Sequence, residues 1–103
     1  RTYRVADFAA LADAIGSGEV AVLDVRQSDE YADSHIEGAL NIPLHELIDR
    51  VGGLPGGEVW VHCASGYRAS IAASILDRHG RDVVLVDDEF AKAEELNLTS
   101  DAR

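Results

Sequence analysis

The sequence predicts an α/β domain with a central, mainly parallel sheet of about five strands and helices on both faces. Short runs rich in β-branched residues alternate with longer helical stretches along the chain. Several of the apolar runs are nearly continuous, which is typical of strands that are covered on both faces. The length of 103 residues allows one compact domain, which we place at residues 1–96, followed by a flexible C-terminal tail over residues 97–103.

The expected strands follow from runs of valine, leucine and isoleucine. The three most buried cover residues 20–25, 58–63 and 82–86. Residues 39–42 form a shorter strand, because Pro43 has no backbone N–H with which to continue a ladder. Residues 3–5 add a short edge strand.

Helical periodicity and capping residues predict the segments between these strands. Asp7 is placed to cap the first helix, and Gly80 ends the helix that follows the buried strand at residues 58–63. The predicted helices cover residues 8–15, a short stretch from Ser28, residues 44–51, residues 68–79 and residues 88–96.

Composition and charge restrict the class of protein. With 19 acidic and 9 basic side chains the formal net charge is -10, which argues against nucleic acid or an anionic membrane surface as a partner. The apolar fraction of 47% argues against a disordered chain. Without a membrane-spanning run or a signal peptide, we expect a location in the reducing cytoplasm. Because the chain has no methionine, we expect it to be processed or cut from a longer polypeptide.

The loop that begins at Cys63 carries the chemistry. This residue follows a buried strand and precedes an alanine-rich helix, which places it where parallel sheets hold ligands and where a helix N-terminus stabilises negative charge. Gly66 lets successive amides point inward as an anion-binding nest, and Arg68 adds a positive charge at its mouth. A single cysteine is otherwise an inert apolar residue, but this combination favours a nucleophilic thiolate. The expected substrate-binding loop is Ala64, Ser65, Gly66, Tyr67 and Arg68.

Four segments occur in a specific order along the chain. They are the Asp-x-Arg strand at residues 22–26, the Glu-Tyr pair at 30–31 with the His-Ile-x-Gly-Ala stretch within 34–39, the Asn-Ile-Pro-Leu segment at 41–44 and the Cys-x-x-Gly-x-Arg loop at 63–68. Together they resemble the single-domain rhodanese family. The resemblance implies a sulfurtransferase without a cofactor, in which Cys63 takes a sulfane sulfur from a small-molecule donor and passes the sulfur to a thiol or other thiophilic acceptor.

The chain departs from the family pattern at two places. Ala69 stands where many members have serine, and Asp87-Asp88 replaces a pair of glycines after the last strand. The two carboxylates repel anionic donors, and Ala64 and Ser65 add no positive charge to the loop. We therefore expect thiosulfate to be a poor donor and a low-molecular-weight or protein persulfide to be the better one.

Two other functions stay open. One is a non-catalytic or sulfur-relay module that passes sulfur to a fused or partner enzyme domain, for example one of the metallo-hydrolase fold. The other is a cysteine phosphatase or arsenate reductase. Four residues separate Cys63 from Arg68, one fewer than in a phosphatase loop, so this second alternative is disfavoured.

Four further polar residues have expected structural roles near the loop. Asp24 and Arg26 are expected to form an ion pair or to anchor loops, although steering of substrate is the alternative. His35 is expected to fix a turn by a hydrogen bond, and His62 either packs in the core or tunes the thiolate. No spacing of ligands indicates a metal site.

Overall fold

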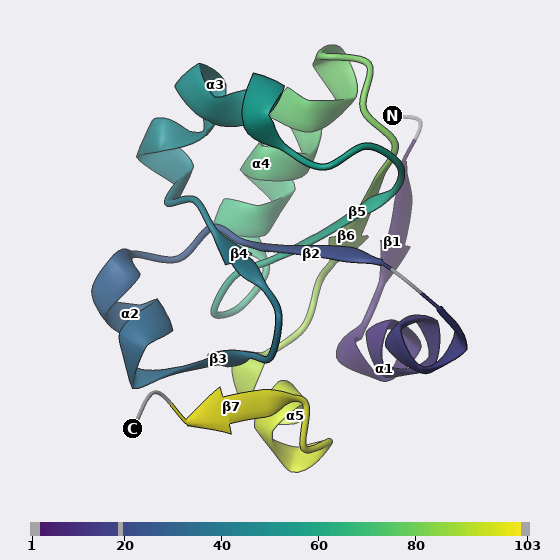
Figure 1. Ribbon diagram of the computed structural model, residues 1–103, viewed down its shortest axis with the longest axis vertical. Coiled ribbons are helices and arrows are strands. Elements are labelled where there is room, and N and C mark those ends of the chain that lie inside the picture. Colours follow the sequence, from purple (N-terminus) through teal and green to yellow (C-terminus); the bar gives the residue numbers. More distant parts are fainter. Residues whose placement is uncertain (1–2, 19, 102–103) are drawn as a thin grey trace.

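A five-stranded parallel sheet forms the centre of the computed structural model, which describes residues 3–18 and 20–101 (Figure 1). The strand order is β1-β6-β5-β2-β4, and each neighbouring pair is parallel. The strands are β1 (Arg4–Ala6), β2 (Ala21–Asp24), β4 (Leu40–Asn41), β5 (Val59–His62) and β6 (Val83–Val86). Each strand overlaps one that the sequence predicted, and the predicted fold class is confirmed.

Helices cover both faces of this sheet, as Figure 1 shows. They are α1 (Phe8–Ser17), α2 (Ser28–Asp33), α3 (Leu47–Arg50), α4 (Tyr67–Arg78) and α5 (Phe90–Glu95), with 3-10 turns η1 (Leu44–Glu46) and η2 (Val51–Gly53) on either side of α3. The first helix begins as predicted, because Asp7 Oδ1 accepts a hydrogen bond from the Ala10 N–H at 2.9 Å.

Two apolar clusters form, one on each face of the sheet. The cluster that includes α3 and α4 contains Leu23, Val61, Cys63, Ala69 and Ala72, among others. The opposite cluster contains residues of α1 and α5, such as Phe8, Leu11, Trp60, Val84 and Ala93. Successive residues of β5 therefore point to opposite faces, which separates the side chains of Val61 and Trp60.

The C-terminal part of the chain differs from the expected flexible tail. Thr99–Asp101 forms strand β7, which pairs antiparallel with β3 (Ser34–Ile36) in a second, two-stranded sheet. The sequence predicted a turn around His35 and did not predict these two strands. Strands of three residues show almost no periodicity in the sequence, and this pairing joins distant parts of the chain. Residues 102–103 of the expected tail lie outside the described residues.

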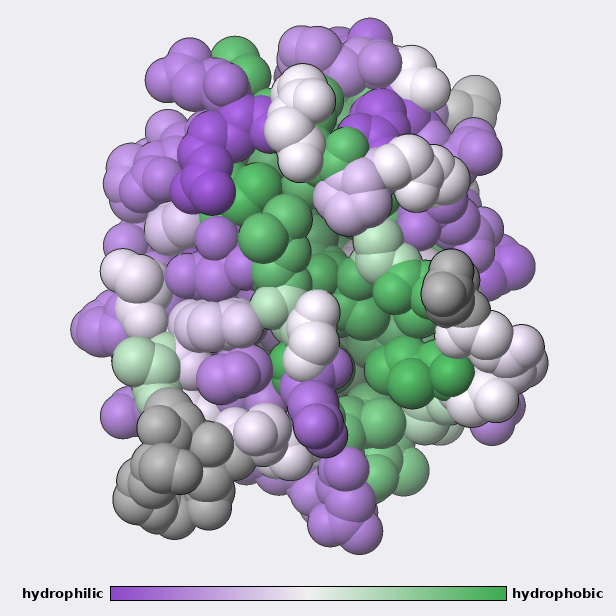
Figure 2. Space-filling view, viewed as in Figure 1, coloured by the Kyte–Doolittle hydropathy of each residue, from purple (hydrophilic) through white to green (hydrophobic). Residues whose placement is uncertain are grey.

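Polar and charged side chains occupy much of the face drawn in Figure 2. Figure 2 shows purple residues around an apolar band that crosses the middle of this face, in the region where β2 and β4 lie in Figure 1. Leu40 of the edge strand β4 is 38% exposed. None of the helices in the described ranges has the length and apolar character needed to cross a membrane.

Candidate active site

Three neighbouring strands end at the same edge of the sheet. Cys63 follows β5, Asp87 follows β6, and Arg26 lies two residues beyond β2. Because these strands are parallel and adjacent, their carboxyl ends meet at one edge, where open α/β sheets bind ligands. The loop predicted from the sequence is therefore brought together with residues from two other parts of the chain.

Two backbone amides point at the sulfur atom of Cys63. The Gly66 N–H donates to Sγ at 3.1 Å and the Ala69 N–H donates to it at 3.2 Å. Cys63 is only 1% exposed, so water competes little for these bonds. The thiol also faces the N-terminus of the 12-residue helix α4, whose dipole favours negative charge. Two N–H donors and the positive end of a helix dipole therefore converge on the sulfur atom.

Gly66 can adopt the conformation that this loop requires. Its φ angle is 105°, in the left-handed region that side chains other than glycine rarely enter. A Cβ atom at this position would also overlap the carboxylate of Asp87. Only glycine satisfies both conditions, and its amide can then reach Cys63.

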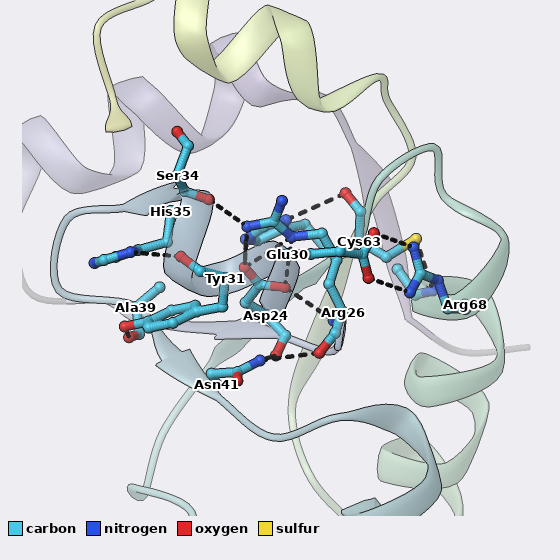
Figure 3. A network of polar contacts seen from close by, with 12 residues as sticks. Asp24, Arg26, Glu30, Tyr31, Ser34, His35, Ala39, Asn41, Cys63 and Arg68 are labelled. Atoms are coloured by element: carbon cyan, nitrogen blue, oxygen red, sulfur yellow. Dashed lines mark hydrogen bonds and ion pairs between the residues drawn. The ribbon is translucent and has the colours of Figure 1, made fainter. Parts of the chain in front are cut away.

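Arg68 is held by Glu30 of helix α2. Its Nη1 and Nη2 donate to the two carboxylate oxygens at 2.7 and 3.1 Å, a bidentate pair that Figure 3 shows beside Cys63. The hydrogen bond from Arg68 lowers the pKa of Glu30 to about 2. The same bond raises the pKa of Arg68 above its usual range. The arginine charge expected at the mouth of the loop is thus paired with a carboxylate.

Asp24 and Arg26 form the ion pair expected from the sequence, inside the protein. Arg26 Nη2 lies 2.7 Å from Asp24 Oδ2, and the two side chains are 6% and 0% exposed. Arg26 Nη2 also donates to the Ser34 carbonyl at 2.7 Å, and its guanidinium lies 4.0 Å from the ring centre of Phe90. Asn41 Nδ2 donates to the carbonyls of both members of the pair (Figure 3). These contacts tie β2 to the segments on either side.

His62 packs in the core on the face opposite to Cys63. Its ring stacks on Phe90 and meets Phe8 edge-on, with ring centres 5.7 and 5.4 Å apart. Burial lowers the pKa of His62, and the Asp24 carboxylate, 3.8 Å from Nε2, offsets this only in part. The neutral ring forms no ion pair with Asp24, and Nε2 has no hydrogen-bond partner among the described residues.

Phe90 links this core to the loop. Its backbone N–H donates to the carbonyl of Ala64 at 2.8 Å, while its ring lies against Arg26 and His62. The first turn of α5 therefore holds the second residue of the loop in place. Within the rest of the loop, Ser65 and Tyr67 are exposed, Tyr67 to 74%.

His35 lies in strand β3, away from the Cys63 thiol. Its Nδ1 is 2.9 Å from the Tyr31 carbonyl, and the two rings stack with centres 4.0 Å apart. The Tyr31 hydroxyl in turn donates to the Ala39 carbonyl at 2.6 Å. These contacts join α2 to the start of β4. No group of three or more His, Cys, Asp or Glu side chains in the described ranges could hold a metal ion.

A comparison with protein families decides the identity of the fold. The profile of the rhodanese-like domain matches residues 7–95. The chain belongs to the rhodanese-like domain family. A solved structure of a rhodanese-related protein from Thermoplasma volcanium is 30% identical, with a TM-score of 0.82 over 91% of this chain and 93% of that one.

Two curated relatives of this rhodanese-like domain are proteins of different kinds. One is an HTH-type transcriptional regulator from Mycobacterium tuberculosis, 41% identical over 70% of this chain and 33% of its own. Another is the thiosulfate sulfurtransferase PspE from Escherichia coli, 36% identical over 56% of this chain and 59% of its own. The matched regions thus span about a third to three fifths of these relatives.

Three residues of the site were missed or misjudged by sequence analysis. Glu30 was noted only as part of the Glu-Tyr pair at the start of a short helix, although it pairs with Arg68 across 38 positions. Phe90 was expected only as part of a helix. Asp87 was noticed as a departure from the family pattern, but its contact with Gly66 was not foreseen. The opposite charges of Glu30 and Arg68 were the one available signal, and several other acids would have fitted it equally well.

Proposed function

We propose that this domain is a sulfurtransferase in which Cys63 carries a sulfane sulfur as a persulfide. The observation that supports this most directly is the pair of amides from Gly66 and Ala69 that point at Cys63 Sγ. Family membership and the relative named thiosulfate sulfurtransferase agree with it.

In the first half-reaction, the Cys63 thiolate attacks the sulfane sulfur of the donor. A new S–S bond forms on Sγ, the bond between the sulfane sulfur and the rest of the donor breaks, and the leaving group departs with the electron pair. With thiosulfate the leaving group is sulfite; with an organic persulfide it is a thiolate. The amides of Gly66 and Ala69 stabilise the attacking thiolate before this step.

In the second half-reaction, an acceptor thiolate attacks the outer sulfur of the persulfide. The bond from Sγ to this sulfur breaks, and Cys63 leaves as a thiolate again. The two amides therefore stabilise Sγ in both half-reactions, because Sγ carries negative charge as the nucleophile in the first and as the leaving group in the second. The Arg68–Glu30 pair and the Phe90 amide act as positioning groups that hold the ends of the loop.

Sulfur loading tests the proposal. The protein is incubated with thiosulfate or glutathione persulfide, and intact mass spectrometry then measures whether the mass of one sulfur atom has been added. We expect an adduct on the natural chain and none on Cys63→Ser, which keeps the size of the side chain and lacks the thiol. If neither donor adds sulfur to the natural chain, the proposal is wrong.

The alternatives are separated by two further assays on the same protein. A sulfur-relay module loads sulfur but does not deliver it to an excess of a small thiol, whereas a sulfurtransferase turns over with that thiol. A phosphatase releases phosphate from an aryl phosphate and does so only while Cys63 is present.

A further inference from the structure

Asp87 brings a carboxylate directly against the loop that holds Cys63. A Cβ atom on Gly66 would lie only 3.3 Å from Cγ of Asp87 and 3.4 Å from its Cα. The amide of the same glycine donates to Cys63 Sγ. The Asp87 side chain has no hydrogen bond or ion pair with any other described residue, and the residue is exposed.

The cations near the site do not neutralise this carboxylate. Arg68, the only cation of the loop, is paired with Glu30 at 2.7 Å. Arg26 is buried and paired with Asp24 at 2.7 Å. Asp88, the next residue, uses its two carboxylate oxygens to accept hydrogen bonds from the backbone N–H groups of Phe8 and Glu89. Asp87 is therefore the carboxylate that lies directly against Gly66, and no ion pair among the described residues neutralises it.

From this charge pattern we propose that Asp87 selects the sulfur donor by charge, so that monoanionic donors react faster than dianionic ones. The proposal rests on the proposed sulfurtransferase function. A donor must bring its sulfane sulfur to Sγ, which accepts a hydrogen bond from the amide of Gly66, the residue that this carboxylate adjoins. Each additional negative charge on the donor adds Coulomb repulsion from the Asp87 carboxylate at short distance. This repulsion raises the barrier to persulfide formation with that donor.

Two small donors differ almost only in this charge. Thiosulfate is a dianion, whereas methanethiosulfonate carries a methyl group in place of one oxygen and is a monoanion. Attack of the Cys63 thiolate on either donor gives the Cys63 persulfide anion, with sulfite leaving from the first and methanesulfinate from the second. Both reactions conserve charge and need no oxidant or reductant.

The experiment measures the second-order rate of persulfide formation with each donor, by intact mass, in the natural chain, Asp87→Asn and Asp82→Asn. Asp82 is the matched control because it is exposed at the other end of β6 and its replacement changes the net charge equally. We expect Asp87→Asn to raise the rate ratio of thiosulfate to methanethiosulfonate roughly fivefold at low ionic strength. The change becomes smaller in molar salt, which screens the carboxylate.

Each outcome has a definite meaning. A ratio that rises in Asp87→Asn and stays constant in Asp82→Asn supports the proposal. An unchanged ratio in Asp87→Asn, or an equal change in both variants, overturns it and leaves the sulfurtransferase function intact, because sulfur is still loaded. If the natural chain takes no sulfur from either donor, both proposals fail.

Discussion

At the scale of single residues, Gly66 is the position on which the loop geometry depends. Its amide is one of the two that contact Sγ, its φ angle is positive, and its Cα faces the carboxylate of Asp87. A side chain here would both strain the left-handed turn and collide with Asp87, and either effect would displace the amide from the sulfur.

Gly66→Ala is expected to lower both stability and sulfur loading. The left-handed backbone alone costs roughly 1–3 kcal/mol for a residue with a side chain, and the overlap with Asp87 adds to this. Urea unfolding measures the loss. Gly57→Ala is the matched control, because Gly57 has a φ of +86° and no atom within 4 Å of the added Cβ. Equal losses in the two variants would show that the contact with Asp87 contributes nothing.

At the scale of secondary-structure elements, the ion pair between Glu30 and Arg68 joins α2 to the start of α4. The pair is about one third exposed, so solvent weakens it, but both oxygens of the carboxylate are engaged. The backbone N–H of Gln27 also donates to Glu30 Oε1 at 2.8 Å, which fixes the same carboxylate to the beginning of α2.

Glu30→Gln is expected to reduce stability at neutral pH but not in strong acid. The pKa of Glu30 is lowered in the folded state to about 2 from an ordinary 4.5, so the stabilisation is complete above about 4.5 and is lost as the pH falls toward 2. Urea unfolding of the two proteins between neutral pH and about pH 2 measures this difference.

The exposed pair of Glu46 and Arg50, with a distance of 3.0 Å, provides the control for this comparison. Glu46→Gln removes a carboxylate from a pair within one helical region and should change stability less than Glu30→Gln at neutral pH. A difference between Glu30→Gln and the natural chain that persisted unchanged at about pH 2 would contradict the role assigned to ionised Glu30.

At the scale of the whole molecule, the sheet has a chemically different environment on each face. Cys63 lies in the cluster with α4, where amides reach its sulfur, whereas the neutral ring of His62 lies between Phe8 and Phe90 in the opposite cluster. His62, the last residue of β5, and Cys63, which follows it, thus have different surroundings, because their side chains point to opposite faces. His62 is a core residue, and its protonation opposes folding.

The molecule is expected to lose stability as the pH falls below about 6.5, partly through His62. Burial lowers the pKa of His62 in the folded state, so the unfolded chain takes up the proton at higher pH and is favoured in acid. His62→Phe keeps an aromatic ring at this position and cannot be protonated. Between about pH 8 and about pH 5, the midpoint of its urea unfolding should therefore fall less than that of the natural chain.

The exposed His45 serves as the control for this prediction, since it lies at the surface with its side chain 62% exposed. His45→Gln should retain the pH dependence of the natural chain. Identical pH profiles for the natural chain and His62→Phe would rule out a contribution of His62 to acid sensitivity.

The sequence by itself determined the α/β fold class, the order of the main strands and helices, and the position of Cys63 between β5 and α4. These features follow from hydrophobic periodicity, capping residues and the spacing of a short loop, all of which are local along the chain. The family resemblance rests on the same local motifs, and it was confirmed by the match over residues 7–95.

Only the tertiary structure decided which residues meet at the site. The strand order places Asp87 against Gly66, packing across the sheet assigns His62 to the core, and folding of α2 brings Glu30 to Arg68 over 38 positions. Pairing of β3 with β7 likewise joins segments from distant parts of the chain. Such contacts depend on how elements pack in three dimensions, and a local pattern contains no information about the distant partner.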